Sequence, residues 1–98
     1  MKQFVDFVDE ALKLCLERKE IYPTVGMFDS IEKQLAYLKA VLIGEETDRT
    51  RLSKIVVGVY AVREFDDSDP EFANALMKAH YIAVRMAKGL KPEMQELL

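Results

Sequence analysis

The fold is decided by one stretch of the sequence, Ile55-Val56-Val57-Gly58-Val59-Tyr60-Ala61-Val62, which is the longest apolar run of the chain. Its β-branched residues favour a buried strand. However, no second strand-like segment exists to pair with it, and an isolated strand leaves its backbone polar groups unsatisfied. The apolar residues of this region also recur at helical spacing, at Leu52, Ile55, Val56, Val59 and Val62. We therefore predict a helix between Asp48, a good N-cap, and Phe65, apolar on most sides and hence the most enclosed in the molecule.

Two amphipathic helices precede this segment. The first covers about residues 2–22, with apolar residues along one stripe and charged residues opposite. Pro23 ends it, because the residue before a proline avoids helical geometry. The second covers about residues 27–43, and Gly44 suits the left-handed conformation that often follows a helix end.

The last long helix has the clearest start signal of the chain. Asp69 is its predicted N-cap, Pro70 takes the first helical position, and Gly89 follows its end. Residues 91–98 then form a short tail. Gly58 lowers the intrinsic stability of the helix predicted between Asp48 and Phe65 by about 1 kcal/mol. A glycine at this cost predicts that another helix approaches closely at that point. Four helices joined by short loops predict an all-α fold, a small four-helix bundle with a short C-terminal tail.

Length and composition restrict the class of protein. The 98 residues, 50 % hydrophobic and 32 % charged, fit one helical domain over residues 1–98. A net charge of −3 disfavours nucleic-acid binding. No apolar run approaches the roughly 18 residues of a membrane span, and Asp6 comes too early for a secretory signal. The single Cys15 allows no internal disulfide, which fits a reducing compartment. Taken together, these features predict a soluble, cytoplasmic protein that binds neither nucleic acid nor membranes.

The residue types that usually carry catalysis are isolated in this sequence. His80 is the only imidazole and borders an apolar stripe, so a structural role is favoured over a catalytic one. Cys15 lies on an apolar stripe, as a small buried hydrophobe does. Ser30-Ile31-Glu32-Lys33 matches the S-x-x-K pattern of penicillin-recognising enzymes, but the companion motifs are missing. With no glycine-rich phosphate loop either, we predict no enzyme, no cofactor and no metal site.

One charged stretch stands out, because Glu64 to Glu71 holds five acids in eight residues. The other 12 acids and the 14 basic residues give the rest of the chain a net charge of +2. One interpretation is a solvated turn whose acids Asp69 and Glu71 stabilise the start of the next helix. The other is a docking surface for a positively charged partner, because Asp66 and Asp67 repel each other and have no local base. A calcium loop is a weaker third option, since the glycine and distal glutamate of an EF-hand are absent.

Four strings of residues resemble, in their order and spacing, a known family of small helical proteins. They are Glu32-Lys33-Gln34-Leu35-Ala36-Tyr37-Leu38, Asp48-Arg49-Thr50-Arg51-Leu52, Gly58-Val59-Tyr60-Ala61-Val62-Arg63-Glu64-Phe65 and Asp69-Pro70-Glu71-Phe72. The family comprises bacterial immunity proteins that neutralise a type VI secretion effector, an NAD(P)+ glycohydrolase. The likeness covers about residues 31–90, and the first helix matches in character only. The resemblance implies an immunity protein that binds a toxin and has no active site of its own.

The resemblance also suggests how the chain could act. A toxin pocket that accepts a dinucleotide must accommodate phosphates and therefore presents basic groups. We hypothesise that the acidic turn docks at or beside such a pocket and excludes the substrate by steric occlusion, with charge speeding association and aromatic anchors holding the complex. The predicted partner-binding residues are Glu64, Asp66, Asp67, Asp69, Tyr60 and Tyr37, the two tyrosines lying near the edges of their apolar stripes. The alternative is a helical adaptor or regulator, monomeric or homodimeric, with no toxin partner.

Overall fold

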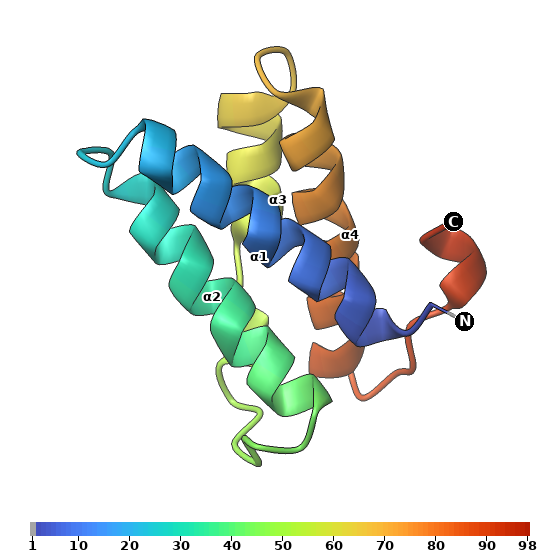
Figure 1. Cartoon of the computed structure of the whole chain (residues 1–98). Coiled ribbons are helices and arrows are strands. Elements are labelled where there is room, and N and C mark those ends of the chain that lie inside the picture. The colour runs from blue at the N-terminus through green and yellow to red at the C-terminus, as the bar shows by residue number, and fades with distance from the viewer. Residues whose placement is uncertain (1) are drawn as a thin grey trace.

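Four α-helices form most of the computed structural model, which describes residues 2–98 (Figure 1). They are α1 (Phe4–Ile21), α2 (Met27–Leu42), α3 (Val57–Tyr60) and α4 (Pro70–Ala87). A π-helix, η2 (Ala61–Phe65), continues α3 directly, and two 3-10 turns lie before α3 and in the C-terminal tail, η1 (Leu52–Lys54) and η3 (Met94–Glu96). No strand occurs between residues 2 and 98, and the predicted all-α fold is confirmed.

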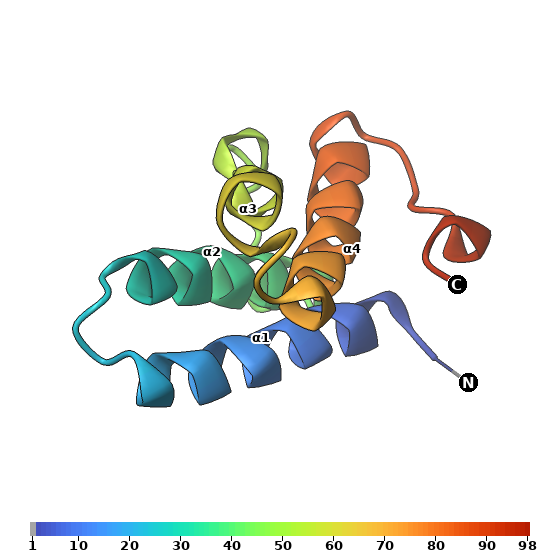
Figure 2. The same ribbon diagram turned by 90° about the horizontal axis from the view of Figure 1, so that it is seen from above.

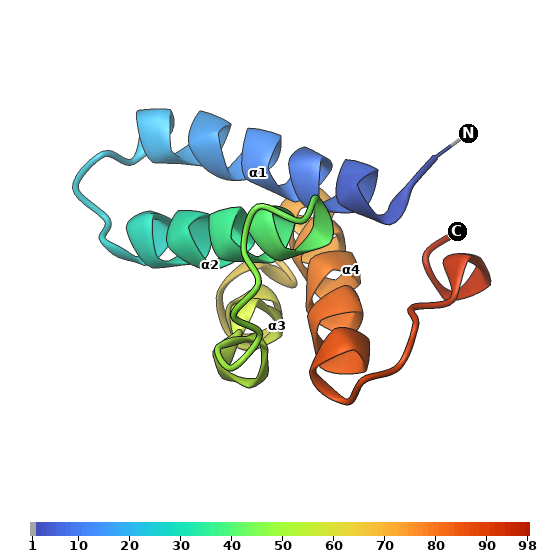
Figure 3. The ribbon, with the colours of Figure 1, turned by 90° about the horizontal axis from the view of Figure 1, so that it is seen from below.

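The helices form two layers. α1 and α2 lie side by side in one layer, and α3 and α4 cross them in the other (Figure 2). An aromatic cluster joins the layers, with ring centroids 4.8 Å apart for Phe65 and Phe72 and 5.8 Å apart for Phe28 and Phe65. The C-terminal tail returns from α4 toward the N-terminal end of α1 (Figure 3), where Leu97 is buried. Among the described residues, no helix is both long enough and apolar enough to cross a membrane.

The helix ends follow the local chemistry of the sequence. Asp69 caps α4 as predicted, because its carboxylate accepts a hydrogen bond from the backbone N–H of Phe72 at 3.3 Å. Gly44 and Gly89 follow α2 and α4 with φ angles of +81° and +73°, a conformation that costs glycine little. The predicted burial of Cys15 is also confirmed, and its thiol donates to the Phe28 carbonyl at 3.4 Å. Burial raises the pKa of the Cys15 thiol to about 11, which keeps it protonated and unreactive.

The helix predicted between Asp48 and Phe65 begins eight residues later than expected, at Val57. Asp48 does not cap a helix, because its carboxylate accepts hydrogen bonds from the backbone N–H and the hydroxyl of Thr50, at 3.0 and 2.7 Å. The chain then passes through η1 and an extended Ile55 before α3 begins. The prediction of a helix from Asp48 was therefore wrong, because a local turn satisfies the polar groups that a cap would have engaged.

The prediction that this helix is the most enclosed one was also wrong. Only one side of α3 and η2 is buried, through Val57, Gly58, Ala61 and Phe65. α4 is more enclosed, with seven buried residues. The valines of the other side of α3 and η2 face solvent, since no helix covers them.

The predicted close approach at Gly58 is confirmed, and the neighbour is His80 of α4. The Gly58 N–H donates to Nδ1 of His80 at 3.2 Å. A Cβ at position 58 would lie 2.7 Å from Cγ of His80, so no larger residue fits without movement of the ring. Burial lowers the pKa of His80, which keeps the imidazole neutral and able to accept this bond at neutral pH. His80 therefore has the structural role that the sequence indicated.

Candidate partner-binding surface

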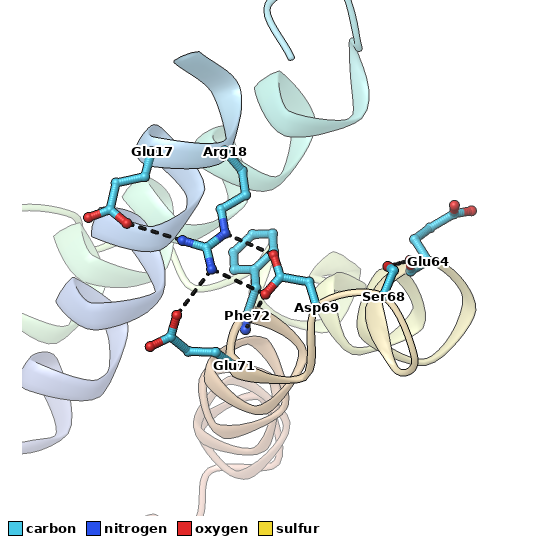
Figure 4. A network of polar contacts seen from close by, with 7 residues as sticks. All are labelled: Glu17, Arg18, Glu64, Ser68, Asp69, Glu71 and Phe72. Carbon is cyan, nitrogen blue, oxygen red and sulfur yellow. Dashed lines mark hydrogen bonds and ion pairs between the residues drawn. The ribbon is translucent and has the colours of Figure 1, made fainter. Parts of the chain in front are cut away.

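The acidic stretch 64–71 divides into a paired part and an unpaired part. Arg18 of α1 holds the paired part, with its Nε 2.8 Å from Oδ2 of Asp69 and a terminal nitrogen 3.1 Å from Oε1 of Glu71 (Figure 4). The same terminal nitrogen also donates to Oδ1 of Asp69 at 3.1 Å. The hydrogen bonds from Arg18 hold the pKa of Asp69 below its usual range. Asp69 and Glu71 are therefore engaged within the protein, as the solvated-turn interpretation expected of them, and additionally bind α1.

The unpaired part consists of Glu64, Asp66 and Asp67. All three are exposed, and none forms an ion pair within residues 2–98. The Ser68 hydroxyl donates to the backbone carbonyl of Glu64 at 2.9 Å and leaves the Glu64 carboxylate free (Figure 4). Arg63, also exposed, reduces the net negative charge of this end of η2 from −3 to −2. These carboxylates are exposed to solvent, which leaves them available to a cationic partner.

The structure brings Tyr60 near the unpaired acids but places Tyr37 elsewhere. Tyr60 is half-buried against the core and precedes Glu64 by four residues on the same continuous helix. Tyr37 is held by an internal hydrogen bond to the Asp48 carbonyl at 2.7 Å, with the Arg51 guanidinium 4.3 Å from the centre of its ring.

The contacts along α2 show that Tyr37 lies at the opposite end of α3 from the acids. Phe28, near the start of α2, packs on Phe65 at the end of η2. Gln34, further along α2, accepts a hydrogen bond from the Val56 N–H at 2.7 Å, just before α3 begins. α2 therefore runs antiparallel to α3 and η2, and Tyr37 lies one further turn beyond Gln34. The six predicted contact residues do not form one continuous patch.

Sequence reasoning missed an exposed apolar strip on the same helix. Val56, Val59 and Val62 are 42 %, 45 % and 62 % exposed, and Met77 of α4 is 44 % exposed. A hollow of about 250 Å³ lies beside the contact between η2 and α4 and is lined by Val62, Asp66 and Met77, together with Ala61, Pro70, Ala73 and Asn74. The sequence signal was present, because a helix that is apolar all round and has only one covering layer must expose some of those residues.

The side chains of this surface are suited to contact with another protein. No group of three His, Cys, Asp or Glu side chains that could hold a metal ion is found in the described part of the chain. His80 and Cys15, the two candidate reactive groups, are committed to internal hydrogen bonds. The surface instead carries exposed carboxylates, exposed valines and a hollow, which are features of a protein–protein interface.

Comparisons with known proteins identify relatives of this chain. The sequence profile of the Tsi6 family matches residues 3–85. The immune protein Tsi6 of Pseudomonas aeruginosa is 39 % identical over 90 residues, which cover 92 % of this chain and 96 % of the relative.

Two solved structures share the fold at 38 % sequence identity. A chain in the structure of Tse6 in complex with Tsi6 superposes with a TM-score of 0.89, covering 94 % of this chain and 98 % of that one. The structure of Tsi6 from Pseudomonas aeruginosa superposes with a TM-score of 0.81 and covers 86 % of this chain and 98 % of its own. The resemblance seen in the sequence is confirmed, and the chain belongs to the Tsi6 family of immunity proteins.

Proposed function

We propose that this protein binds a cognate effector toxin and blocks its active site by covering it. The observation that carries the proposal is the relative in the Tse6–Tsi6 complex, whose fold this chain shares with a TM-score of 0.89. An immunity protein of this kind needs no catalytic group of its own, since a rigid surface that fits the toxin is sufficient. The helical layers, joined by a buried aromatic cluster, supply such a rigid support.

The effector that best fits this chain is an NAD(P)+ glycohydrolase. A pocket for a dinucleotide must bind phosphates, and the cationic groups that do so would attract Glu64, Asp66 and Asp67. A standard interface takes about 800 Å² from each partner, which is roughly one eighth of the 6051 Å² surface of this protein. The contact therefore extends beyond the acids and includes neighbouring side chains of α3 and α4.

We expect the gene for the effector to adjoin the gene for this protein, and the direct test is protection of cells that produce this effector. Co-expression is expected to restore growth and cellular NAD levels, and the two proteins are expected to co-purify in a stable complex. A protein that neither protects nor binds that effector contradicts the proposal. A homodimer that does not bind the effector would instead support the alternative of a helical adaptor or regulator with no toxin partner.

Removing the three unpaired charges is expected to slow association with the effector. We expect the triple variant Glu64→Gln, Asp66→Asn, Asp67→Asn to bind about tenfold more slowly at low salt and to show a weaker salt dependence, with little change in the dissociation rate. Association rates measured across a salt series test this.

A matched control removes three exposed acids elsewhere, Glu10, Glu20 and Glu45, each replaced by glutamine. It changes the net charge equally and is expected to leave most of the association rate intact. Asp69 is not substituted, because its role as cap and as partner of Arg18 would mix stability with binding. Equal rates for the two triple variants would contradict a docking role for the acidic turn.

A further inference from the structure

We propose that Val56, Val59 and Val62, here called the valine ridge, form the centre of the effector contact, and that opposite charges at its two ends fix the direction in which the effector docks. The inference rests on the proposed function and names the part of the surface that would hold the complex. Its first basis is exposure, because each of the three valines is at least 42 % exposed.

The ridge is continuous along α3 and η2. The Val59 N–H donates to the Val56 carbonyl at 2.9 Å, which forms a turn between these two residues. Val59 and Val62 lie three apart on the continuous helix and are therefore neighbours on its surface. Beside Val62, the hollow toward Met77 offers space for a partner side chain. Isolated exposed apolar residues are common, but a row of three beside a hollow is typical of an interaction site.

Folding alone gives no reason for valine at these positions. The buried side of the helix is already supplied by Val57, Ala61 and Phe65, while the ridge residues contact solvent. Val59 and Val62 lie within the helix, where valine is a weaker helix former than alanine or most charged residues, so these two exposed valines cost helix stability. The ridge continues into the π-helix η2, and such irregular turns occur frequently at functional sites.

The ends of the ridge differ in charge. At the Val56 end, Lys33 and Lys54 border a hollow of about 180 Å³ that also includes Tyr37 and Arg51. Lys33 and Lys54 are exposed and form no ion pair within the described range, whereas Arg51 pairs with Glu46. At the Val62 end, Glu64, Asp66 and Asp67 outnumber Arg63 and leave a net charge of −2, so the ridge runs from a basic end to an acidic end.

This pattern specifies a partner with three features. The partner carries an apolar strip that contacts the valines, cationic groups opposite the acidic end and anionic groups opposite Lys33 and Lys54. In the reversed orientation like charges would meet at both ends, which is strongly unfavourable. In the proposed function, the cationic groups are those of the effector's phosphate-binding pocket, so the acidic end covers the active site and the basic end contacts the rim.

The test compares ridge variants with a matched exposed valine, using the effector encoded beside the gene. Val59→Ser and Val62→Ser are each expected to weaken binding about tenfold, mainly through faster dissociation. Val25→Ser is the control, because Val25 is 39 % exposed in the α1–α2 connection and is not part of the ridge. It is expected to bind like the wild type. Since all three valines are exposed, the variants are expected to keep the wild-type melting temperature, which confirms that they fold.

Charge reversal tests the direction of docking. Lys33→Glu with Lys54→Glu, and separately Asp66→Lys with Asp67→Lys, are each expected to weaken binding about tenfold or more. If the wild type binds the effector and the ridge variants bind equally well, this inference fails while the proposed function stands. If the wild type does not bind, both fail. A wild-type homodimer that Val62→Ser dissociates, with effector binding unchanged, would show that the ridge contacts a second copy and would also overturn the inference.

Discussion

Gly58→Ala is expected to lower the free energy of unfolding by about 2 kcal/mol, although alanine is the better helix former. The added Cβ would lie 2.7 Å from Cγ and 2.8 Å from Cδ2 of His80, well inside contact distance. These atoms belong to the base of a half-buried ring, so the ring must shift and the hydrogen bond from the residue 58 N–H to Nδ1 weakens. Overpacking of this kind costs about 1–3 kcal/mol, and the gain in helix propensity is at most about 1 kcal/mol. Urea unfolding measures the difference, and the melting temperature is expected to fall by about 10 °C.

A double-mutant cycle assigns this loss to the contact with His80. In a His80→Ala background the Cβ finds space, so Gly58→Ala is expected to cost at least about 1 kcal/mol less than in the wild type. Gly26→Ala is the matched control, because its Cβ would meet no atom within 4 Å, and only a small change of about 0.5 kcal/mol is expected at this N-cap position. An equal cost of Gly58→Ala in both backgrounds would show that the contact with the His80 ring is not the cause of the loss.

The long helices were predictable because periodicity and end signals agreed in each of them. The apolar stripes of α1, α2 and α4 give their buried faces, and Asp69 with Pro70 gives the start of α4 to the residue. The segment 48–65 lacked this agreement. Its apolar residues have helical spacing, but Leu52 reaches the core from a 3-10 turn and Ile55 from extended backbone. Spacing alone cannot distinguish these conformations, since each of them can bury the same side chains.

The candidate site was predictable only where its chemistry is local in the sequence. The acidic cluster is visible as a count of residues, but Arg18 and Asp69 are 51 positions apart, and nothing in the sequence pairs them. Tyr37 and Tyr60 look equivalent in sequence, yet they lie toward opposite ends of α3. Exposure of the valine ridge depends on how many layers cover α3, which is a property of the whole fold. Local composition therefore identified one end of the surface, and tertiary packing determined the rest.

Arg18→Ala is expected to lower the free energy of unfolding by about 2 kcal/mol at neutral pH. The Arg18 side chain is only 17 % exposed and donates to both oxygens of Asp69, whose own side chain is 22 % exposed. Its guanidinium also lies 5.8 Å from the centre of the Phe72 ring. Hydrogen bonds to charged groups contribute about 1.5–3 kcal/mol each, whereas the exposed pairs of Arg18 with Glu17 and Glu71 contribute little. Without Arg18, α1 loses its polar connection to the start of α4, and urea unfolding at pH 7 measures the cost.

The pH dependence separates the ion pair from simple packing. Arg18 holds the pKa of Asp69 below its ordinary value, so the unfolded chain takes up a proton first on acidification. The stabilisation is complete above the ordinary aspartate pKa of about 3.9 and is lost as the pH falls through the lower pKa of the folded protein. The difference between wild type and Arg18→Ala is therefore expected to shrink as the pH falls below about 3.9.

Two companion variants complete this test. Asp69→Asn keeps a good N-cap but removes the charge, so Arg18→Ala is expected to cost much less in that background. Lys39→Ala removes the more exposed pair with Asp9, which has the same 2.8 Å distance as the Arg18–Asp69 pair, and is expected to have a far smaller effect. A loss from Arg18→Ala that persists unchanged at low pH and in the Asp69→Asn background would show that Arg18 acts through packing on Phe72. In that case the paired acids would contribute little to holding α1 against α4, and Asp69 would again be a candidate for contact with the effector.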